Sequence, residues 1–147
     1  MILTLINLSN SRMPRKFIST WIEESERALV QMKIMPQKQF DLTIVFLKPS
    51  EAKKINFKFR KKNYPTDVLS FEGEFEGSLG ELVLCPKVIE KQSKEHMLSI
   101  RQELGYLLLH GILHLLGFDH EKNKQDAIKM FAIQDEIFEK LCRTFWK

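Results

Sequence analysis

Residues 109–120 read Leu109-His-Gly-Ile-Leu-His-Leu-Leu-Gly-Phe-Asp-His120, and the rest of the chain is interpreted around this stretch. On a helix, His110 and His114 lie four residues apart and therefore on one face, one turn above the other. Gly117 can adopt the left-handed conformation that ends a helix, so the chain can fold back and bring His120 toward the other two rings. Three imidazoles that converge in this way form a zinc-type ligand set with a fourth position open for water.

The spacing matches the extended zincin signature His-x-x-x-His-x-x-Gly-x-x-His at all three histidines and at the glycine. Apolar neighbours predict that this helix is buried, and burying an unpaired polar group costs on the order of 1–3 kcal/mol, which a shared metal would offset. The alternative is two hydrogen-bonded core histidines and a third exposed in a loop, but His120 and Gly117 together favour the metal. His96 fits no such pattern and is expected to be solvated near a helix start. The apolar neighbours are Leu107, Leu108, Leu109, Ile112, Leu113, Leu115 and Leu116.

One position departs from the zinc proteases. Their first histidine is followed by a glutamate that activates the bound water, whereas Gly111 occupies that place here. A metal lowers the pKa of its bound water toward neutrality without such a base, so hydrolysis stays possible. A peptidase is therefore the less favoured kind of hydrolase.

A basic segment lies between positions 48 and 62, with seven bases against the single acid Glu51. This local excess provides an electropositive surface for phosphates, although it would also suit a solvated helix face. Asn56 and Arg60 share a helix face, and a guanidinium placed there can bind a phosphate bidentately. The alternative for Arg60 is an ion pair with one of the acids between positions 67 and 81. The bases are Lys48, Lys53, Lys54, Lys58, Arg60, Lys61 and Lys62, and the acids are Asp67, Glu72, Glu74, Glu76 and Glu81.

Composition restricts the class of protein. The chain has 147 residues, 44% hydrophobic and 29% charged, with 23 Lys and Arg against 19 Asp and Glu, a net charge of +4. These values predict one globular domain over residues 1–147 and exclude disordered or collagen-like chains. Cys85 and Cys142 lie far apart, which argues against a disulfide framework and a thiolate zinc site. We expect no signal peptide and no membrane span, and a cytoplasmic location.

Strands and helices are predicted to mix without regular alternation, which favours an α+β fold with a small sheet packed against helices. One helix is expected to begin at Pro49 with Ser50 as its cap and Ala52, Ile55 and Phe59 on its inner face. The helical stretch from Pro86 to Leu116 is expected to divide near positions 92–95. The other expected elements are strands at 2–7, 41–47, 67–71 and 79–85 and helices at 15–32 and 124–145.

Beyond these patterns, the segment from His110 to His120 resembles the signature of the YbeY family, the bacterial rRNA maturation endoribonucleases. Asn56-Phe-Lys-Phe-Arg60 followed by Pro65-Thr-Asp-Val-Leu-Ser-Phe71 is similar to a second family motif, and Leu79-Gly-Glu-Leu-Val-Leu-Cys-Pro86 to the strand between them. The order and spacing agree from about Asn56 to Glu121. Phe118 stands where the family often has tyrosine, and nothing before Lys48 could be matched.

The resemblance implies a zincin-like α+β fold, with the metal site at the end of a buried central helix and one zinc ion on His110, His114 and His120. It also implies cleavage of single-stranded RNA in 16S rRNA maturation, with the small ribosomal subunit as partner, and a part in ribosome quality control. Arg60 is the expected catalytic residue, offsetting charge on the phosphate. Asp119 either orients a ligating histidine or caps the turn after Gly117. The alternatives are a non-catalytic zinc-containing ribosome-assembly factor and, less favoured, a metallopeptidase.

Overall fold

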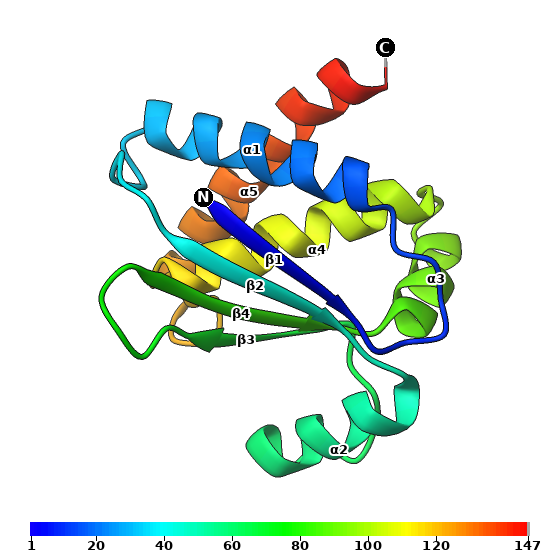
Figure 1. Ribbon diagram of the computed structural model, residues 1–147. Coiled ribbons are helices and arrows are strands. Elements are labelled where there is room, and N and C mark those ends of the chain that lie inside the picture. The colour runs from blue at the N-terminus through cyan, green and yellow to red at the C-terminus, as the bar shows by residue number, and fades with distance from the viewer. Residues whose placement is uncertain (147) are drawn as a thin grey trace.

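The computed structural model describes residues 1–146 and places a four-stranded mixed sheet against a group of helices (Figure 1). The strand order is β1-β2-β4-β3, with β1, β2 and β4 parallel and β3 antiparallel to β4. The predicted α+β class is therefore confirmed. The elements are β1 (Ile2–Asn7), α1 (Arg15–Gln31), β2 (Asp41–Phe46), α2 (Pro49–Arg60), β3 (Val68–Glu72), β4 (Ser78–Leu84), α3 (Pro86–Glu95), α4 (Ile100–Leu115) and α5 (Lys124–Phe145).

Helix α4 is the centre of the main core. Its apolar side chains are buried on nearly every side, as the sequence predicts, because β4, α1, α3 and α5 all contact it. Strand residues of one sheet face, such as Ile44 and Leu82, belong to the same buried cluster. Trp21 of α1 fixes the helix further by donating a hydrogen bond of 2.9 Å from Nε1 to the carbonyl of Gly105. The packing on all sides therefore fixes the position of α4 and of the histidines on its polar face.

A smaller core lies on the opposite face of the sheet, because successive strand residues point to opposite sides. Val45 and Val83 of the strands pack there with Ala52 and the half-buried Ile55 of α2. Helix α2 lies apart from the other helices at the lower edge of the sheet in Figure 1. Its C-terminal end is thereby left exposed beside β3.

Of two predicted helix boundaries, one differs from the expectation and one agrees with it. Helix α2 begins at Pro49 with Lys48 in the cap position, so Ser50 is not the cap. Proline is well suited to the first helical position because its fixed φ is already helical and its missing N–H would have no partner. The predicted division of the stretch from Pro86 to Leu116 is confirmed: α3 ends at Glu95, and a capping box of Ser99 and Gln102 starts α4.

The buried faces of two helices also differ from the predicted spacing. Phe59 of α2 is exposed, although its ring contacts Phe71 at a centroid distance of 5.0 Å. On α5, the sequence places Ile128 with Phe131 and Leu141 at helical intervals, and the structure shows Ile128 exposed. The buried residues of α5 are Met130, Gln134, Ile137 and Leu141.

Cys85 and Cys142 are both free, as predicted. No helix within residues 1–146 has the length and apolar character needed to cross a membrane.

Candidate metal centre

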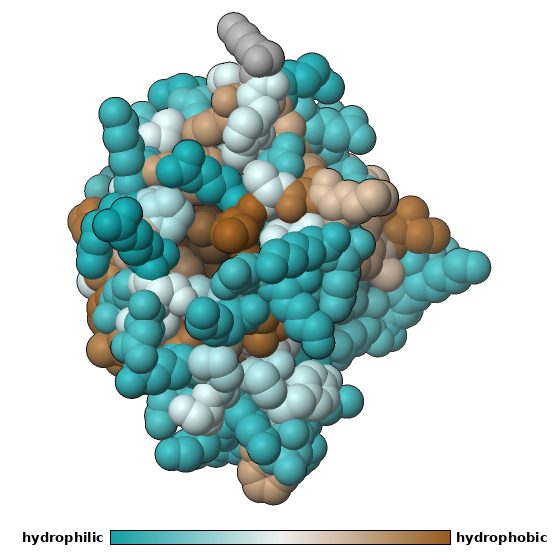
Figure 2. All heavy atoms as spheres, turned by 90° about the vertical axis from the view of Figure 1, so that its right-hand side faces the viewer, coloured by the Kyte–Doolittle hydropathy of each residue, from teal (hydrophilic) through white to brown (hydrophobic). Residues whose placement is uncertain are grey.

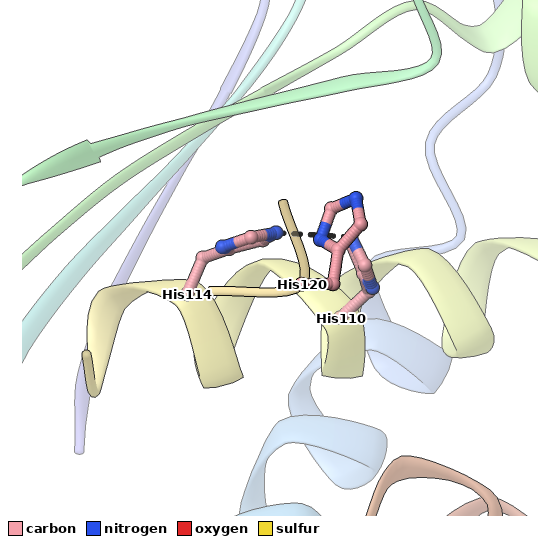
Figure 3. A group of neighbouring side chains, drawn as sticks. All are labelled: His110, His114 and His120. Atoms are coloured by element: carbon pink, nitrogen blue, oxygen red, sulfur yellow. Dashed lines mark hydrogen bonds between the residues drawn. The ribbon is translucent and has the colours of Figure 1, made fainter. Parts of the chain in front are cut away.

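The structure brings the three predicted ligands together. His110 and His114 project from one face of α4, with their Nε2 atoms 3.1 Å apart. Gly117, at φ 100°, turns the chain back after the helix, and Figure 3 shows the following segment placing His120 against the other two rings. The ring centroid of His120 lies 5.1 Å from that of His110 and 5.0 Å from that of His114. One nitrogen from each ring lies within 4.8 Å of the others.

A buried amide orients His110. The Nδ1 atom of His110 lies 3.0 Å from Oε1 of Gln134, which is fully buried on α5. The Gln134 amide nitrogen donates to the carbonyl of Tyr106 at 3.4 Å, so its oxygen is the group that faces the ring. This network assigns the proton to Nδ1 and leaves the Nε2 lone pair free, the arrangement usual for metal-ligating histidines.

Burial keeps the first two rings neutral. It lowers the pKa of His110 from 6.5, although the hydrogen bond to Gln134 acts in the opposite direction. Burial also lowers the pKa of His114, helped by the neighbouring rings and opposed by a hydrogen bond to the Phe118 backbone. A low-dielectric environment disfavours the charged imidazolium. Both rings are therefore in the neutral form that binds metals at pH 7.

The donor set fits a zinc ion. Buried Nδ1 of His120 has no hydrogen-bond partner among residues 1–146, and the Nε2 atoms of His110 and His114 face each other. Zinc–nitrogen bonds of 2.0–2.1 Å in a tetrahedron would place ligand nitrogens about 3.3 Å apart, close to the distance found here. A cation at this point would therefore satisfy nitrogen atoms that the protein leaves without partners.

Asp119 does not orient a ligand. Its Oδ1 atom accepts a hydrogen bond of 2.8 Å from the backbone N–H of Glu121, and within the described chain it makes none with a histidine of the cluster. Of the two roles considered for this residue, capping the turn is the one observed. The orienting group that sequence reasoning missed is Gln134. A glutamine on the apolar face of a helix was the available signal.

Gly111 is buried where α4 lies directly on the sheet. A Cβ atom at this position would come within 2.6 Å of Cδ2 of Leu82 in β4. A larger residue here, such as the glutamate that follows the first histidine in zinc proteases, would require the Leu82 side chain to shift. The packing of α4 on β4 therefore favours glycine at this position.

A cleft of about 980 Å³ contains the histidines and extends from the end of α2 to the start of α4. Arg60 lines it from the end of α2, with its side chain 39% exposed. The Arg60 Nη2 atom lies 3.8 Å from Oε1 of Glu121, and that oxygen lies 3.9 Å from Nε2 of His120. Arg60 therefore pairs with an acid in the loop that carries His120, rather than with one of the acids between positions 67 and 81.

Asn56 holds the chain that follows α2. It is fully buried, and its Nδ2 atom donates a hydrogen bond of 2.8 Å to the carbonyl of Tyr64. Lys61 ends the helix in the left-handed conformation at φ 60°. These two features place Arg60 and Tyr64 at the cleft.

All seven bases of the predicted basic segment are exposed. Figure 2 views the molecule from the side of α3, and its lower part, where α2 lies, is mostly hydrophilic. The positively charged surface therefore adjoins the cleft at Arg60.

His96 is exposed, as predicted, but it has a partner that the sequence did not indicate. It directly follows α3, and its Nδ1 atom lies 2.7 Å from Oε1 of the buried Glu103 on α4. Both side chains line the cleft. Because the partners come from two helices, no sequence spacing marks the pair.

Comparisons with known proteins agree with this geometry. The sequence model described as Endoribonuclease YbeY matches residues 5–142, which includes the N-terminal region where motif comparison found nothing. A protein of Bdellovibrio bacteriovorus named Endoribonuclease YbeY is 53% identical over 95% of this chain and 94% of its own length. A protein of Persephonella marina with the same name is 38% identical over 96% of this chain and 94% of its own. The solution structure of a Thermotoga maritima protein matches with a TM-score of 0.68 and 26% identity, covering 98% of this chain and 91% of that one.

Proposed function

This chain belongs to the YbeY endoribonuclease family, and on that premise we propose that it is a zinc-dependent endoribonuclease that cuts single-stranded RNA. The proposed role is the maturation of 16S rRNA and the quality control of ribosomes in the cytoplasm, with the small ribosomal subunit as partner. The whole of residues 1–147 would act as a single hydrolase domain.

The observation that carries the proposal is the convergence of three histidines in a cleft that also contains an arginine. His110, His114 and His120 are the proposed zinc ligands, since their nitrogens lie within 4.8 Å of one another. Arg60 is the proposed catalytic residue, since it reaches the loop of His120 through Glu121. Hydrolysis of a phosphodiester needs positive charge near the phosphoryl oxygens, and this cleft provides it.

In the proposed reaction each residue has a separate role. A zinc ion held by the three histidines would act as a Lewis acid and activate a water. Gln134 keeps the proton of His110 on Nδ1, away from the metal. The guanidinium of Arg60 binds the phosphate bidentately and offsets the charge that develops on it. The lysines of α2 follow the RNA backbone and contribute affinity without reading the sequence.

The test is an assay of the purified protein on single-stranded RNA and on casein. We expect RNA to be cut, cleavage to stop with a chelator and return with zinc, and casein to stay intact. RNA binding without cleavage by the zinc-loaded protein would instead support a non-catalytic assembly factor. Cleavage of casein would support a peptidase. Protein from the same preparation carrying His114→Ala controls for contaminating nucleases.

A further inference from the structure

A buried carboxylate in the cleft has no part in the chemistry above. Glu103 is only 2% exposed, and its one hydrogen-bond partner among residues 1–146 is His96, at 2.7 Å. Carboxylates are seldom buried so completely, because losing water destabilises their charge unless partners replace it. A carboxylate has about four acceptor positions, and one hydrogen bond leaves most of them unfilled.

Apolar and aromatic side chains line the same cleft as Glu103. These side chains are Leu98, Tyr106, Leu107 and Phe138. The rings of Tyr106 and Phe138 meet edge to face at a centroid distance of 5.0 Å, and the Tyr106 hydroxyl donates to Asp135. Apolar and aromatic walls around a polar group are typical of sites that hold unstacked bases of single-stranded RNA.

This end of the cleft is continuous with the metal centre. Glu103 and His110 are seven residues apart on α4, which is two turns on one face of the helix. At a rise of 1.5 Å per residue the two positions are about 10 Å apart along the axis. A nucleotide next to the one being cut can span this distance within the same strand.

The chemistry of the carboxylate selects the base. A carboxylate only accepts hydrogen bonds, so it pairs best with a base edge that presents adjacent donors. The Watson–Crick edge of guanine offers N1–H and the N2 amino group side by side, whereas the other three bases place an acceptor next to their donor. Two parallel hydrogen bonds to an ionised carboxylate are both stronger and more specific than one.

We propose that Glu103, held by His96, forms a nucleobase subsite that takes a guanine of the RNA strand bound across His110 and His114. The proposal rests on the function proposed above. It differs from a purely structural ion pair between α3 and α4, which would affect stability but not the choice of base.

The experiment measures by anisotropy the binding of fluorescent single-stranded RNA to the zinc-loaded protein, with phosphorothioate linkages in the RNA so that the strand resists cleavage. The probes are oligouridines that carry one guanine, adenine or cytosine at the centre. We expect the guanine probe to bind about tenfold more tightly than the others, in the range found for bidentate base contacts. Glu103→Gln, which keeps the shape but presents an amide, should abolish this preference. Glu95→Gln changes the charge equally in the neighbouring helix, outside the cleft, and should keep it.

His96→Gln separates the subsite from the ion pair. This variant breaks the pair but leaves the carboxylate, so the preference for guanine should survive, whatever happens to the melting temperature. Loss of preference in both variants with equal falls in melting temperature would show that the pair is only structural. RNA binding by the parent protein without a preference would overturn the subsite alone. A failure to bind any RNA would overturn the proposed function with it.

Discussion

Helices α4 and α2 each carry two polar side chains four residues apart, yet only one of these pairs is rigid at both positions. On α4, His110 and His114 lie in a buried helix and contact each other at 3.1 Å. On α2, Asn56 is fully buried and bonded to the backbone, whereas Arg60 is 39% exposed with its nearest acid at 3.8 Å. On the enclosed helix α4, the four-residue spacing is therefore enough to set the positions of the two histidine rings. At the exposed end of α2, spacing places Arg60 on the correct helix face but does not fix its side-chain contacts.

The largest effect is expected at the enclosed pair. His114→Ala removes one of the three proposed zinc ligands, so zinc affinity should fall by more than the roughly 10- to 100-fold that loss of an orienting residue costs, and RNA cleavage should stop. Metal content by atomic absorption and cleavage of single-stranded RNA measure the two consequences. Arg12→Ala is the control, since that exposed side chain lies outside the cleft and should leave both zinc content and cleavage unchanged. Full zinc content in His114→Ala would show that the three rings are not the ligand set.

The exposed arginine should affect chemistry but not metal. Arg60→Ala is expected to lower the cleavage rate by about 10²- to 10³-fold, the usual loss when a donor to a developing negative charge is removed. Arg60→Lys should recover part of the rate, because it restores charge without the planar fork. Single-turnover cleavage and zinc content are the measurements, with Arg12→Ala as an exposed control outside the cleft. Loss of zinc in Arg60→Ala would make this arginine structural.

The amide behind the cluster should have an intermediate effect. Gln134→Leu removes the acceptor for Nδ1 of His110, and zinc affinity should fall about 10- to 100-fold. Gln134→Glu keeps an acceptor at the same place and should bind zinc more tightly than the leucine variant. Competition with a fluorescent chelator measures both. Equal affinities in the two variants would mean that Gln134 only fills space.

Acid should destabilise the metal-free protein through the same histidines. Burial lowers the pKa of His110 and His114 from 6.5, so the unfolded chain takes up these protons before the folded protein does. The free energy of unfolding should therefore decrease as the pH falls below about 6.5. Thermal melting of chelator-treated protein between pH 7.5 and 5.5 tests this. The double variant His110→Gln, His114→Gln should show a shallower dependence, and an unchanged slope would contradict the assignment.

The smallest effect is expected from the lysines at the C-terminal end of α2 and just beyond it. Replacing Lys58 and Lys62 together by alanine should weaken RNA binding and lower the salt dependence of log K by up to about 1.4, at roughly 0.7 for each phosphate contact with a single strand. Titrations at several salt concentrations measure the slope. Lys16→Ala on α1 should leave it unchanged. An unaltered slope in the α2 variant would place the RNA elsewhere.

The sequence predicted the features that depend on neighbouring residues and missed those that depend on contacts between distant segments. Apolar periodicity and capping residues placed the helices and strands closely, and the histidine spacing predicted the cluster, because these features depend on neighbours along the chain. Contacts between distant segments could not be predicted from the sequence. Gln134 facing His110, Glu121 facing Arg60 and Glu103 facing His96 each join residues that no periodicity relates. The exposure of Ile128 likewise depends on how α5 is rotated against α4.

The contact between Gly111 and Leu82 limits what this scaffold could become. Introducing the protease glutamate at position 111 would drive its side chain into β4, so the expected product is a distorted or unstable protein instead of a new peptidase. Conversion to that chemistry would first require space at Leu82, by a shift of its side chain or its replacement by a smaller residue. The packing of a single leucine thus separates this protein from a class of hydrolase with the same arrangement of histidines.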